Sequence, residues 1–339
     1  MRVAHIMAGA AVGGAETFFV RLCLALHRAG EDVFCAIRTH PARAAELRAG
    51  GITPQEFRFG GPLDVLTKPR LRRALKTFAP AIVVAWMNRA ARKTPTGPWL
   101  LAGRLGGYYD LANYRNCDRL IGNTRGIVRW ATEQGWPANR IDWLPNFSPD
   151  LAGGVPLART APRVLLAMGR LHPNKGFDVA IRALARLPQA ELWLAGEGPE
   201  RAALESLARR EGVAERVRML GWRNDQASLL ASADLLLCPS RHEPLGNVVL
   251  EAWSAARPVV AAASQGPSEL IAHGATGLLV PMDDPAALAD AANSVLEDSS
   301  RAASLGQRGR AEYEAHFTEA AVVQRWQGWL RRTAHEGRA

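Results

Sequence analysis

Short apolar runs alternate with amphipathic helical segments along most of this chain of 339 residues. Such alternation is typical of parallel β-sheets, because a crossover, usually a helix, must follow each strand before the next parallel strand begins. In the first half we predict strands at 2–8, 32–38 and 81–86 and helices at 16–29, 41–48 and 68–78. In the second half we predict strands at 163–169, 190–195, 217–220, 233–238 and 258–262 and helices at 176–185, 199–211 and 226–231. The expected fold class is α/β.

The length and the distribution of prolines predict two domains. A chain of 339 residues exceeds the usual size of a single hydrophobic core, and its hydrophobic content of 48% is ample for two. Prolines and glycines crowd the segment 145–162. We therefore expect one Rossmann-like domain at 1–155 and another at 156–317, followed by a last helix at 318–335 with apolar residues at helical spacing.

Cysteine usage and hydropathy favour a cytoplasmic protein. The 4 cysteines are dispersed with no Cys-x-x-Cys pair, so the sequence suggests neither a zinc site nor a disulfide framework. The apolar run at the N-terminus is short and is interrupted by His5 and Gly9, which is unfavourable for a secretory signal. No apolar run approaches the roughly 18 residues that a transmembrane helix requires.

Two carboxylates bracket a Pro-Leu-Gly turn that opens a predicted helix. Glu243 and Glu251 are separated by seven residues, and at about 3.6 residues per turn they fall within about 80° of one another. We expect free backbone amides at Leu245, Gly246 and Asn247, where the helix dipole favours an anion. Amides that bind phosphate and carboxylates that accept hydroxyl groups suit a nucleotide sugar. The alternative is an ordinary turn and helix cap followed by a solvated glutamate.

The residues after this pair make the motif more specific. A strand entered by Pro258, a turn with Gly266 that starts a helix, and a further strand at 278–280 follow in order. The run 240–281 resembles the nucleotide-binding half of retaining GT-B glycosyltransferases of glycosyltransferase family 4. The resemblance implies two Rossmann-like parallel-sheet domains facing a central cleft. It also implies that the N-terminal domain binds the acceptor, that the C-terminal domain binds the nucleotide sugar, and that the last helix packs back on the N-terminal domain.

A second motif follows the first strand of the C-terminal domain. Arg170 and Lys175 lie in a short loop that ends at Gly176, where a helix starts. The loop resembles the family's Gly-Arg-Leu…Lys-Gly motif, whose cations neutralise charge that grows on the leaving nucleoside diphosphate. Gly198 and Trp222 occupy positions that lie near the base and the ribose in the family. Trp222 either stacks on the base or fills the core, and the sequence does not distinguish the two.

A glycine-rich loop at 8–16 follows the first strand. The loop lacks the Gly-x-Gly-x-x-Gly spacing of dinucleotide-binding folds, and the second strand ends in Arg38-Thr39 rather than in the acid that would hold an NAD ribose. A dehydrogenase is therefore disfavoured. The loop resembles the family's N-terminal loop, in which Gly13 and Gly14 let the backbone approach the donor phosphate. An ordinary strand-to-helix turn is the alternative.

The chain departs from the family pattern near the acceptor cleft. Many members carry a histidine there, but the equivalent segment, 101–109, has none. We therefore assign no histidine a catalytic role. The sequence also lacks an Asp-x-Asp motif, which agrees with a reaction that requires no metal and no cofactor.

The net charge of +10 lies in the first half. Residues 1–158 contain 21 Lys and Arg in total against 11 Asp and Glu, whereas residues 159–339 contain 21 basic and 21 acidic residues. The predicted helix 68–78 is the densest part, and its cations lie mostly off an apolar stripe. Such a helix can rest on anionic lipid headgroups, or it can be an ordinary helix with a solvated basic face. A second cluster, expected at strand ends where it would hold an anionic acceptor, comprises Arg89, Arg92, Lys93 and Arg104. No nucleic-acid-binding motif is present.

The resemblance, together with these features, implies a retaining, metal-independent glycosyltransferase of the hexosyltransferase type. The resemblance implies that Glu243 accepts hydrogen bonds from donor-sugar hydroxyls, that Glu251 holds the ribose, and that Arg170 and Lys175 stabilise the leaving diphosphate. We expect a UDP-sugar rather than a GDP-sugar as the donor. The expected acceptor is an anionic envelope glycolipid or polysaccharide, such as lipopolysaccharide core, at the inner face of the cytoplasmic membrane. The alternatives are a sugar-nucleotide epimerase of the same fold and a non-catalytic nucleotide-sugar-binding module.

Overall fold

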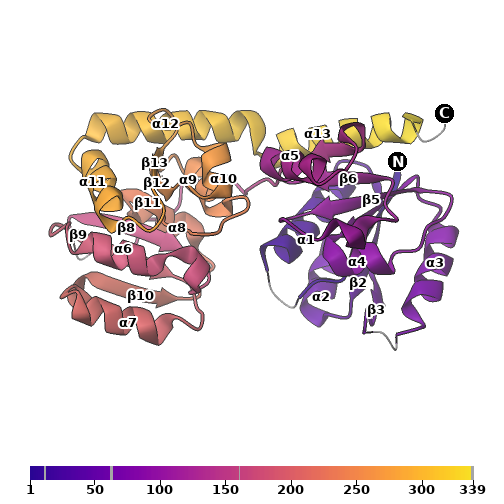
Figure 1. The fold of residues 1–339 in the computed structure, drawn as a ribbon, viewed down its shortest axis with the longest axis horizontal. Coiled ribbons are helices and arrows are strands. Elements are labelled where there is room, and N and C mark those ends of the chain that lie inside the picture. Colours follow the sequence, from indigo (N-terminus) through magenta and orange to yellow (C-terminus); the bar gives the residue numbers. More distant parts are fainter. Residues whose placement is uncertain (11–12, 62–63, 160, 337–339) are drawn as a thin grey trace. The chain divides into compact units, whose positions relative to one another are not determined.

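The computed structural model describes residues 1–10, 13–61, 64–159 and 161–336. The chain divides into two compact units (Figure 1). The first unit contains Met1–Asn146 and the residues from Glu319 onward, and the second contains Phe147–Thr318. The chain therefore enters the second unit within its proline-rich segment and returns to the first unit for its last helix.

Within the described residues, the first unit contains one sheet of seven parallel strands in the order β3-β2-β1-β4-β5-β6-β7. The strands are β1 Arg2–Met7, β2 Asp32–Arg38, β3 Gln55–Phe57, β4 Ile82–Trp86, β5 Leu100–Leu105, β6 Arg119–Gly122 and β7 Ile141–Trp143. The helices are α1 Gly14–Arg28, α2 Pro41–Ala49, α3 Thr67–Phe78, α4 Met87–Lys93, α5 Arg125–Glu133 and α13 Glu319–Glu336, with 3-10 turns at Leu111–Tyr114 and Ala138–Arg140.

In the described part of the second unit, six parallel strands form a sheet in the order β10-β9-β8-β11-β12-β13. The strands are β8 Arg163–Met168, β9 Ala190–Ala195, β10 Val217–Gly221, β11 Leu235–Cys238, β12 Val259–Ala262 and β13 Leu278–Val280. The helices are α6 Phe177–Leu184, α7 Arg201–Arg210, α8 Gln226–Ser232, α9 Asn247–Ser254, α10 Gln265–Leu270, α11 Pro285–Leu296 and α12 Ser299–His316, with 3-10 turns at Pro173–Lys175 and Ala214–Arg216. These two sheets confirm the predicted α/β class with two Rossmann-like domains.

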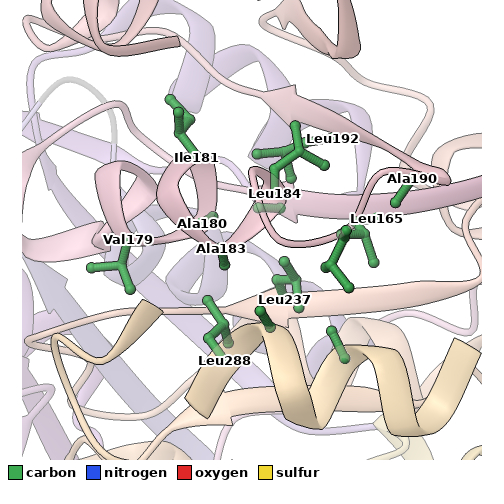
Figure 2. Packing of buried hydrophobic residues seen from close by; sticks show 14 of the residues in the cluster. Leu165, Val179, Ala180, Ile181, Ala183, Leu184, Ala190, Leu192, Leu237 and Leu288 are labelled. Carbon is green, nitrogen blue, oxygen red and sulfur yellow. The ribbon is translucent and has the colours of Figure 1, made fainter. Parts of the chain in front are cut away.

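The core of the second unit covers both faces of its sheet. On one face, Leu165 of β8 and Leu237 of β11 pack in one cluster with Leu184 of α6 and Leu288 of α11 (Figure 2). The cluster on the other face includes Trp253 of α9. Strands that are buried on both faces are near-continuous apolar runs, which explains why the sequence predicts them well.

The last helix, α13, packs against α1 and the sheet within the first unit. Its buried residues are Val322, Val323, Trp326, Trp329, Leu330 and Thr333. The Trp326 ring lies 6.0 Å from the ring of His5 in β1, measured between centroids. At the start of the helix Glu319 forms an ion pair with Arg28 at the end of α1. The apolar stripe of α13 is therefore used for packing.

Candidate functional site

Two loops meet at the carboxyl ends of β8 and β11 in the second unit. The strand order reverses at β8, because β9 and β10 lie on one side of it and β11, β12 and β13 lie on the other. Ligands of open parallel sheets bind at such a reversal, outside the carboxyl ends of the strands. The loop after β8 (169–176) carries Lys175, and the loop after β11 (239–246) carries Glu243. Two predicted site residues therefore lie where the topology favours a ligand.

The amino group of Lys175 forms an ion pair with Oε2 of Glu243. The Lys175 side chain is 24% exposed and that of Glu243 is 12% exposed, so both charges are largely removed from water. Burial lowers the pKa of Lys175, but the charge and hydrogen bond of Glu243, with smaller contributions from Cys238 and Glu251, raise that pKa above its usual value. Lys175 therefore keeps its positive charge close to both glutamates of the Glu-x7-Glu pair.

A glycine and two backbone hydrogen bonds hold these loops together. Gly176 has a φ of 63°, and a Cβ at this position would lie 2.1 Å from the carbonyl oxygen of Pro239. The carbonyl oxygen of Asn174 accepts hydrogen bonds from the backbone N–H groups of Arg241, at 2.8 Å, and His242, at 3.2 Å. Because only glycine tolerates both the left-handed backbone and the close approach, the residue that follows Lys175 fixes where Lys175 lies.

Arg241 links both loops to α6. Its guanidinium donates two hydrogen bonds to the Asp178 carboxylate, at 2.8 and 2.7 Å, and one to the Pro173 carbonyl oxygen at 2.8 Å, and it forms an ion pair with Asp283. Hydrogen bonding to Asp178 raises the pKa of Arg241. Burial raises the pKa of Asp178, but the hydrogen bonds and charge of Arg241 lower it below its usual value. Sequence reasoning missed Arg241, although it lies directly beside the Glu-x7-Glu pair.

The turn into α9 is closed by Glu243 itself. Its Oε1 accepts a hydrogen bond from the Gly246 N–H at 3.3 Å, and its carbonyl oxygen accepts one from the Gly266 N–H at 2.8 Å. The expectation of a free amide at Gly246 is therefore wrong. The reason is the left-handed conformation of Gly246, with a φ of 89°, which tightens the turn so that the carboxylate caps an amide three residues further on. Leu245 is buried, and Asn247 is the first residue of α9.

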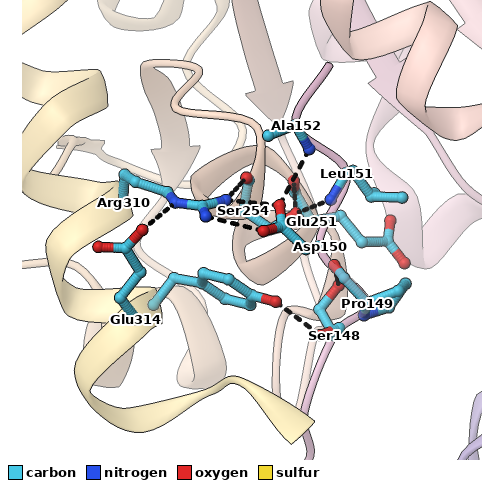
Figure 3. Close-up of polar contacts among 10 residues, drawn as sticks. Ser148, Pro149, Asp150, Leu151, Ala152, Glu251, Ser254, Arg310 and Glu314 are labelled. Carbon is cyan, nitrogen blue, oxygen red and sulfur yellow. Dashed lines mark hydrogen bonds and ion pairs between the residues drawn. The ribbon is translucent and has the colours of Figure 1, made fainter. Parts of the chain in front are cut away.

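Glu251 lies in α9, and its side chain points away from a polar cluster that anchors the end of this helix (Figure 3). In this cluster Arg310 donates two hydrogen bonds to Asp150, at 2.6 and 2.8 Å. Ser254 Oγ donates to the Glu251 carbonyl oxygen at 2.8 Å and accepts from the Leu151 N–H at 3.3 Å. Ser254 therefore links the backbone of Glu251 to a segment far away in the sequence, while the Glu251 carboxylate lies outside the cluster.

The other predicted residues of the second unit follow β8, β9 and β10. Arg170 is exposed, and its guanidinium has no hydrogen-bond or ion-pair partner within the described residues. A Cβ at Gly198 would lie 2.3 Å from the Leu171 carbonyl oxygen, so the loops after β8 and β9 approach closely. Trp222 is 64% exposed, and its Nε1 donates to Asn224 at 3.1 Å. Trp222 therefore does not fill the core, which removes one of its two predicted roles.

In the first unit, Gly13 caps α1 and Gly14 is the first residue of that helix. The carboxylate of Glu16 accepts a hydrogen bond from the Ala10 N–H at 2.7 Å, and a Cβ at Gly13 would lie 2.4 Å from that carboxylate. Gly13 thus leaves room for Glu16, a requirement that the sequence analysis did not recognise. Residues 11–12 of this loop lie outside the described residues. The approach of Gly13 and Gly14 to a donor phosphate stays a prediction.

Arg104 does not belong to the predicted acceptor cluster. It lies in β5, where it is 2% exposed. Its guanidinium carbon is 4.8 Å from the centroid of the Trp86 ring, and the guanidinium donates to Asn146 Oδ1 at 2.7 Å and to the Leu144 carbonyl oxygen at 3.1 Å. Burial lowers the pKa of Arg104 to about 9. The prediction is wrong because aromatic faces and amide oxygens inside the unit already satisfy this guanidinium.

Comparison with known proteins identifies the family. Residues 12–148 match the model described as Glycosyltransferase Family 4, and residues 162–298 match the model described as Glycosyl transferases group 1. The lipopolysaccharide core biosynthesis glycosyltransferase LpsE of Rhizobium meliloti is 34% identical over 95% of this chain and 97% of its own length. The chain is a family 4 glycosyltransferase. Its similarity to LpsD of the same organism, also 34% identical over 95% of this chain and 96% of LpsD, supports the assignment.

The fold of this glycosyltransferase matches solved structures of Anabaena Alr3699/HepE in complex with UDP and with UDP-glucose. The TM-scores are 0.85 and 0.81, and each match covers 98% of the glycosyltransferase and 100% of the solved chain at 22% identity. At this identity the likeness concerns the fold alone. It confirms the GT-B fold that the sequence resemblance predicted.

Three further findings concern metals, membranes and thiols in the glycosyltransferase. Among its described residues, no group of three or more His, Cys, Asp or Glu side chains is arranged to hold a metal ion. In the same part of the chain, none of the helices combines the length and the apolar character needed to cross a membrane. Cys23, Cys35, Cys117 and Cys238 are buried free thiols.

Replacing Arg241 with alanine is expected to lower the melting temperature of the glycosyltransferase by roughly 4–8 °C. The lost charge-assisted hydrogen bonds are worth about 2 kcal/mol, and each kcal/mol shifts the melting temperature by about 2–4 °C in a domain of this size.

The wild-type protein should lose the same contribution to its stability in acid. Because the pKa of Asp178 is depressed on folding, this stability is present above the usual aspartate pKa of about 3.9 and is lost as the pH falls through the lower folded value.

Differential scanning calorimetry at several pH values from about 7 to about 3 checks this expectation. The difference between wild type and R241A should shrink as the pH falls below about 4. R209A, which removes an exposed arginine of α7, is the control and should melt like the wild type at every pH. A difference between wild type and R241A that stays constant down to the lowest pH would contradict the assigned role of the Arg241–Asp178 pair.

Proposed function

We propose that the glycosyltransferase transfers a sugar from a UDP-sugar to a lipopolysaccharide core acceptor, with retention at the anomeric carbon and without a metal ion. The observation that carries the proposal is the ion pair of Lys175 and Glu243 at the carboxyl ends of β8 and β11, with the charge of Glu251 also raising the pKa of Lys175. A cation beside two carboxylates at a sheet reversal suits a ligand with both phosphates and hydroxyl groups. The HepE structures in complex with UDP and UDP-glucose support the choice of donor.

The cations would stabilise the leaving diphosphate. Lys175 stays charged because two glutamates raise its pKa, and Arg170 presents an exposed guanidinium from the same loop. Negative charge on the diphosphate grows as its bond to the sugar breaks, so a fixed cation binds the transition state more tightly than the donor itself. In this proposal the ammonium of Lys175 interacts less with Glu243 and more with the diphosphate as the bond between the sugar and the diphosphate breaks.

The carboxylates would bind hydroxyl groups. Glu243 uses Oε2 for Lys175 and Oε1 for the Gly246 N–H, but each carboxylate oxygen can accept more than one hydrogen bond. Glu243 therefore retains capacity for the hydroxyls of the donor sugar, and Glu251 would accept those of the ribose. In this proposal the loop at Gly198 lies along the diphosphate, and exposed Trp222 stacks on the base.

No side chain is assigned the role of nucleophile. The acceptor hydroxyl attacks the anomeric carbon from the face that the diphosphate leaves, so one carbon–oxygen bond forms as another breaks. A diphosphate oxygen takes the proton of the acceptor hydroxyl. Arg170 and Lys175 balance the charge that remains on the product, which favours departure of the diphosphate over its return.

The relatives and the charge support the proposed acceptor and location of the enzyme. LpsE and LpsD are named for lipopolysaccharide core biosynthesis, which supports an envelope glycolipid as acceptor, bound by the first unit. The excess of 21 Lys and Arg over 11 Asp and Glu in residues 1–158 favours an anionic partner. We therefore place the glycosyltransferase on the inner face of the cytoplasmic membrane as a peripheral protein.

Incubation with radiolabelled nucleotide sugars, without an acceptor, tests the proposed reaction class. A transferase should hydrolyse its donor slowly to free sugar and UDP. A new nucleotide sugar would instead indicate an epimerase, and binding with no product would indicate a nucleotide-sugar-binding module. Thermal shift selects the donors to try, because a ligand at about 100 times its Kd stabilises the protein by about 2.7 kcal/mol. Stabilisation by GDP-sugars alone would contradict the proposed uridine donor.

A further inference from the structure

A hollow of about 800 Å³ lies on the surface of the first unit, along α3 and the residues that precede it. Its lining includes five cations, which are Lys68, Arg72, Arg73 and Lys76 of α3 and Lys93 at the end of α4. These side chains come from two helices that are separated in sequence, so the hollow is more than the basic face of one helix. The proposed transfer reaction assigns no role to the hollow, although Lys93 also belongs to the predicted acceptor cluster.

The positive charge of this hollow is not neutralised within the unit. In the described part of the chain, none of its five cations takes part in an ion pair. Its single carboxylate, Asp64, accepts hydrogen bonds from Thr67 Oγ1 at 2.6 Å and from the Gly60 N–H at 2.7 Å. That carboxylate is therefore committed to the turn before α3. Lys93 donates to the Gly61 carbonyl oxygen at 3.3 Å.

Two exposed aliphatic residues border the hollow. Val65 is 72% exposed and Leu66 is 51% exposed, and they directly precede α3. Val65 also contributes to the lining. In the described part of the first unit, these are the large hydrophobic residues that stand exposed. Unpaired cations beside exposed aliphatics match a membrane interface, where phosphates lie directly above the acyl boundary.

We propose that this hollow binds the phosphate headgroup of an anionic phospholipid while Val65 and Leu66 enter the acyl boundary, so that the first unit docks on a bilayer through this site. The proposal names the surface through which the protein would dock on the membrane. It rests on the proposed function, in which the glycosyltransferase is a peripheral membrane protein. A free phosphate would satisfy the same cations but would leave both aliphatic side chains in water. The lipid is therefore the occupant that accounts for the charged and the apolar parts together.

Matched charge variants test the site. The variant K68Q/R72Q/K76Q removes three charges that line the hollow, and R58Q/R70Q/R115Q removes three exposed charges of the same unit outside it. Binding to vesicles that contain phosphatidylglycerol is measured by co-sedimentation at moderate ionic strength. Because each basic residue at such a surface contributes roughly fivefold to affinity, the hollow variant should bind about 100-fold more weakly. The affinity of the control variant for the vesicles should fall by a factor at least tenfold smaller. Equal losses would show diffuse attraction and overturn the site.

Labelling tests the insertion of the aliphatic pair. Because the native cysteines are buried, a polarity-sensitive fluorophore can be attached selectively to V65C and, as the control, to V155C. Val155 belongs to the second unit and is 76% exposed. Phosphatidylglycerol vesicles should shift the emission of the label at position 65 to the blue and leave that at position 155 unchanged. Unchanged emission at both positions would overturn the insertion.

Two further measurements distinguish failure of the docking proposal from failure of the proposed function. Soluble glycerol phosphate, at the same phosphate concentration as the vesicles, should displace little protein; complete displacement would identify the hollow as a site for a soluble anion and overturn the lipid proposal. Donor hydrolysis without vesicles should be the same in wild type and in both charge variants. If the wild type hydrolyses no nucleotide sugar, the proposed function fails, while the vesicle measurements still decide the fate of the docking site.

Discussion

Replacing Lys175 with alanine is expected to lower kcat for sugar transfer about 10²- to 10³-fold, as for loss of a donor that stabilises a developing oxyanion. The loss should appear in kcat rather than in KM alone, because the proposed contact strengthens as the diphosphate leaves. R170A should behave in the same way, since both cations act on the same group. Steady-state kinetics with the best donor from the radiolabel screen measure both effects.

Lys175 has a second possible role, because it neutralises the largely buried Glu243. The double variant K175A/E243Q separates the roles. If Lys175 only compensates the carboxylate, the double variant should regain most of the activity lost in K175A. Our account predicts that it stays at least as inactive as K175A. R182A, which removes a cation from α6 that is 47% exposed, is the control and should retain near-normal kcat.

Glu243→Gln is expected to lower sugar transfer about 10²-fold or more while UDP binds almost as tightly as to the wild type. Glutamine keeps the size of the side chain but loses the charge that favours hydrogen bonds from the donor sugar. UDP has no such sugar, so its affinity should change little. Transfer kinetics and calorimetric titration of UDP measure the two quantities. E205Q, at a half-buried carboxylate of α7, is the control, and near-normal turnover of E243Q would contradict the role of Glu243.

The sequence predicted the strands of the second unit well because they are buried on both faces. For β9 the predicted bounds agree with Ala190–Ala195, and in the first unit those of β2 agree with Asp32–Arg38. Reasoning from periodicity missed β3, β5, β6 and β7. Three of these strands, β3, β6 and β7, contain only 3, 4 and 3 residues, which is too short for a strand period to stand out. Leu100–Leu105 of β5 carries a glycine and an arginine that interrupt its apolar run.

The candidate site was predicted residue by residue, but its contacts were not. The two loop motifs named Lys175 and Glu243 separately, yet their ion pair joins residues 68 positions apart and depends on two strands being neighbours. The amide of Gly246 was expected to be free because sequence indicates a helix start but not the direction of a nearby carboxylate. Arg104 was placed with surface cations because cation–π burial depends on aromatic rings from other strands and from α13.

The central claim is that the loops after β8 and β11 hold a nucleotide sugar for transfer with retention. Proton NMR during the first minutes of donor hydrolysis tests it most directly, because the newly released sugar reports its anomeric configuration before mutarotation. With an α-linked UDP-sugar the account predicts that the α-anomer appears first, in wild type but not in K175A. First appearance of the β-anomer, or equal hydrolysis by K175A, would contradict it.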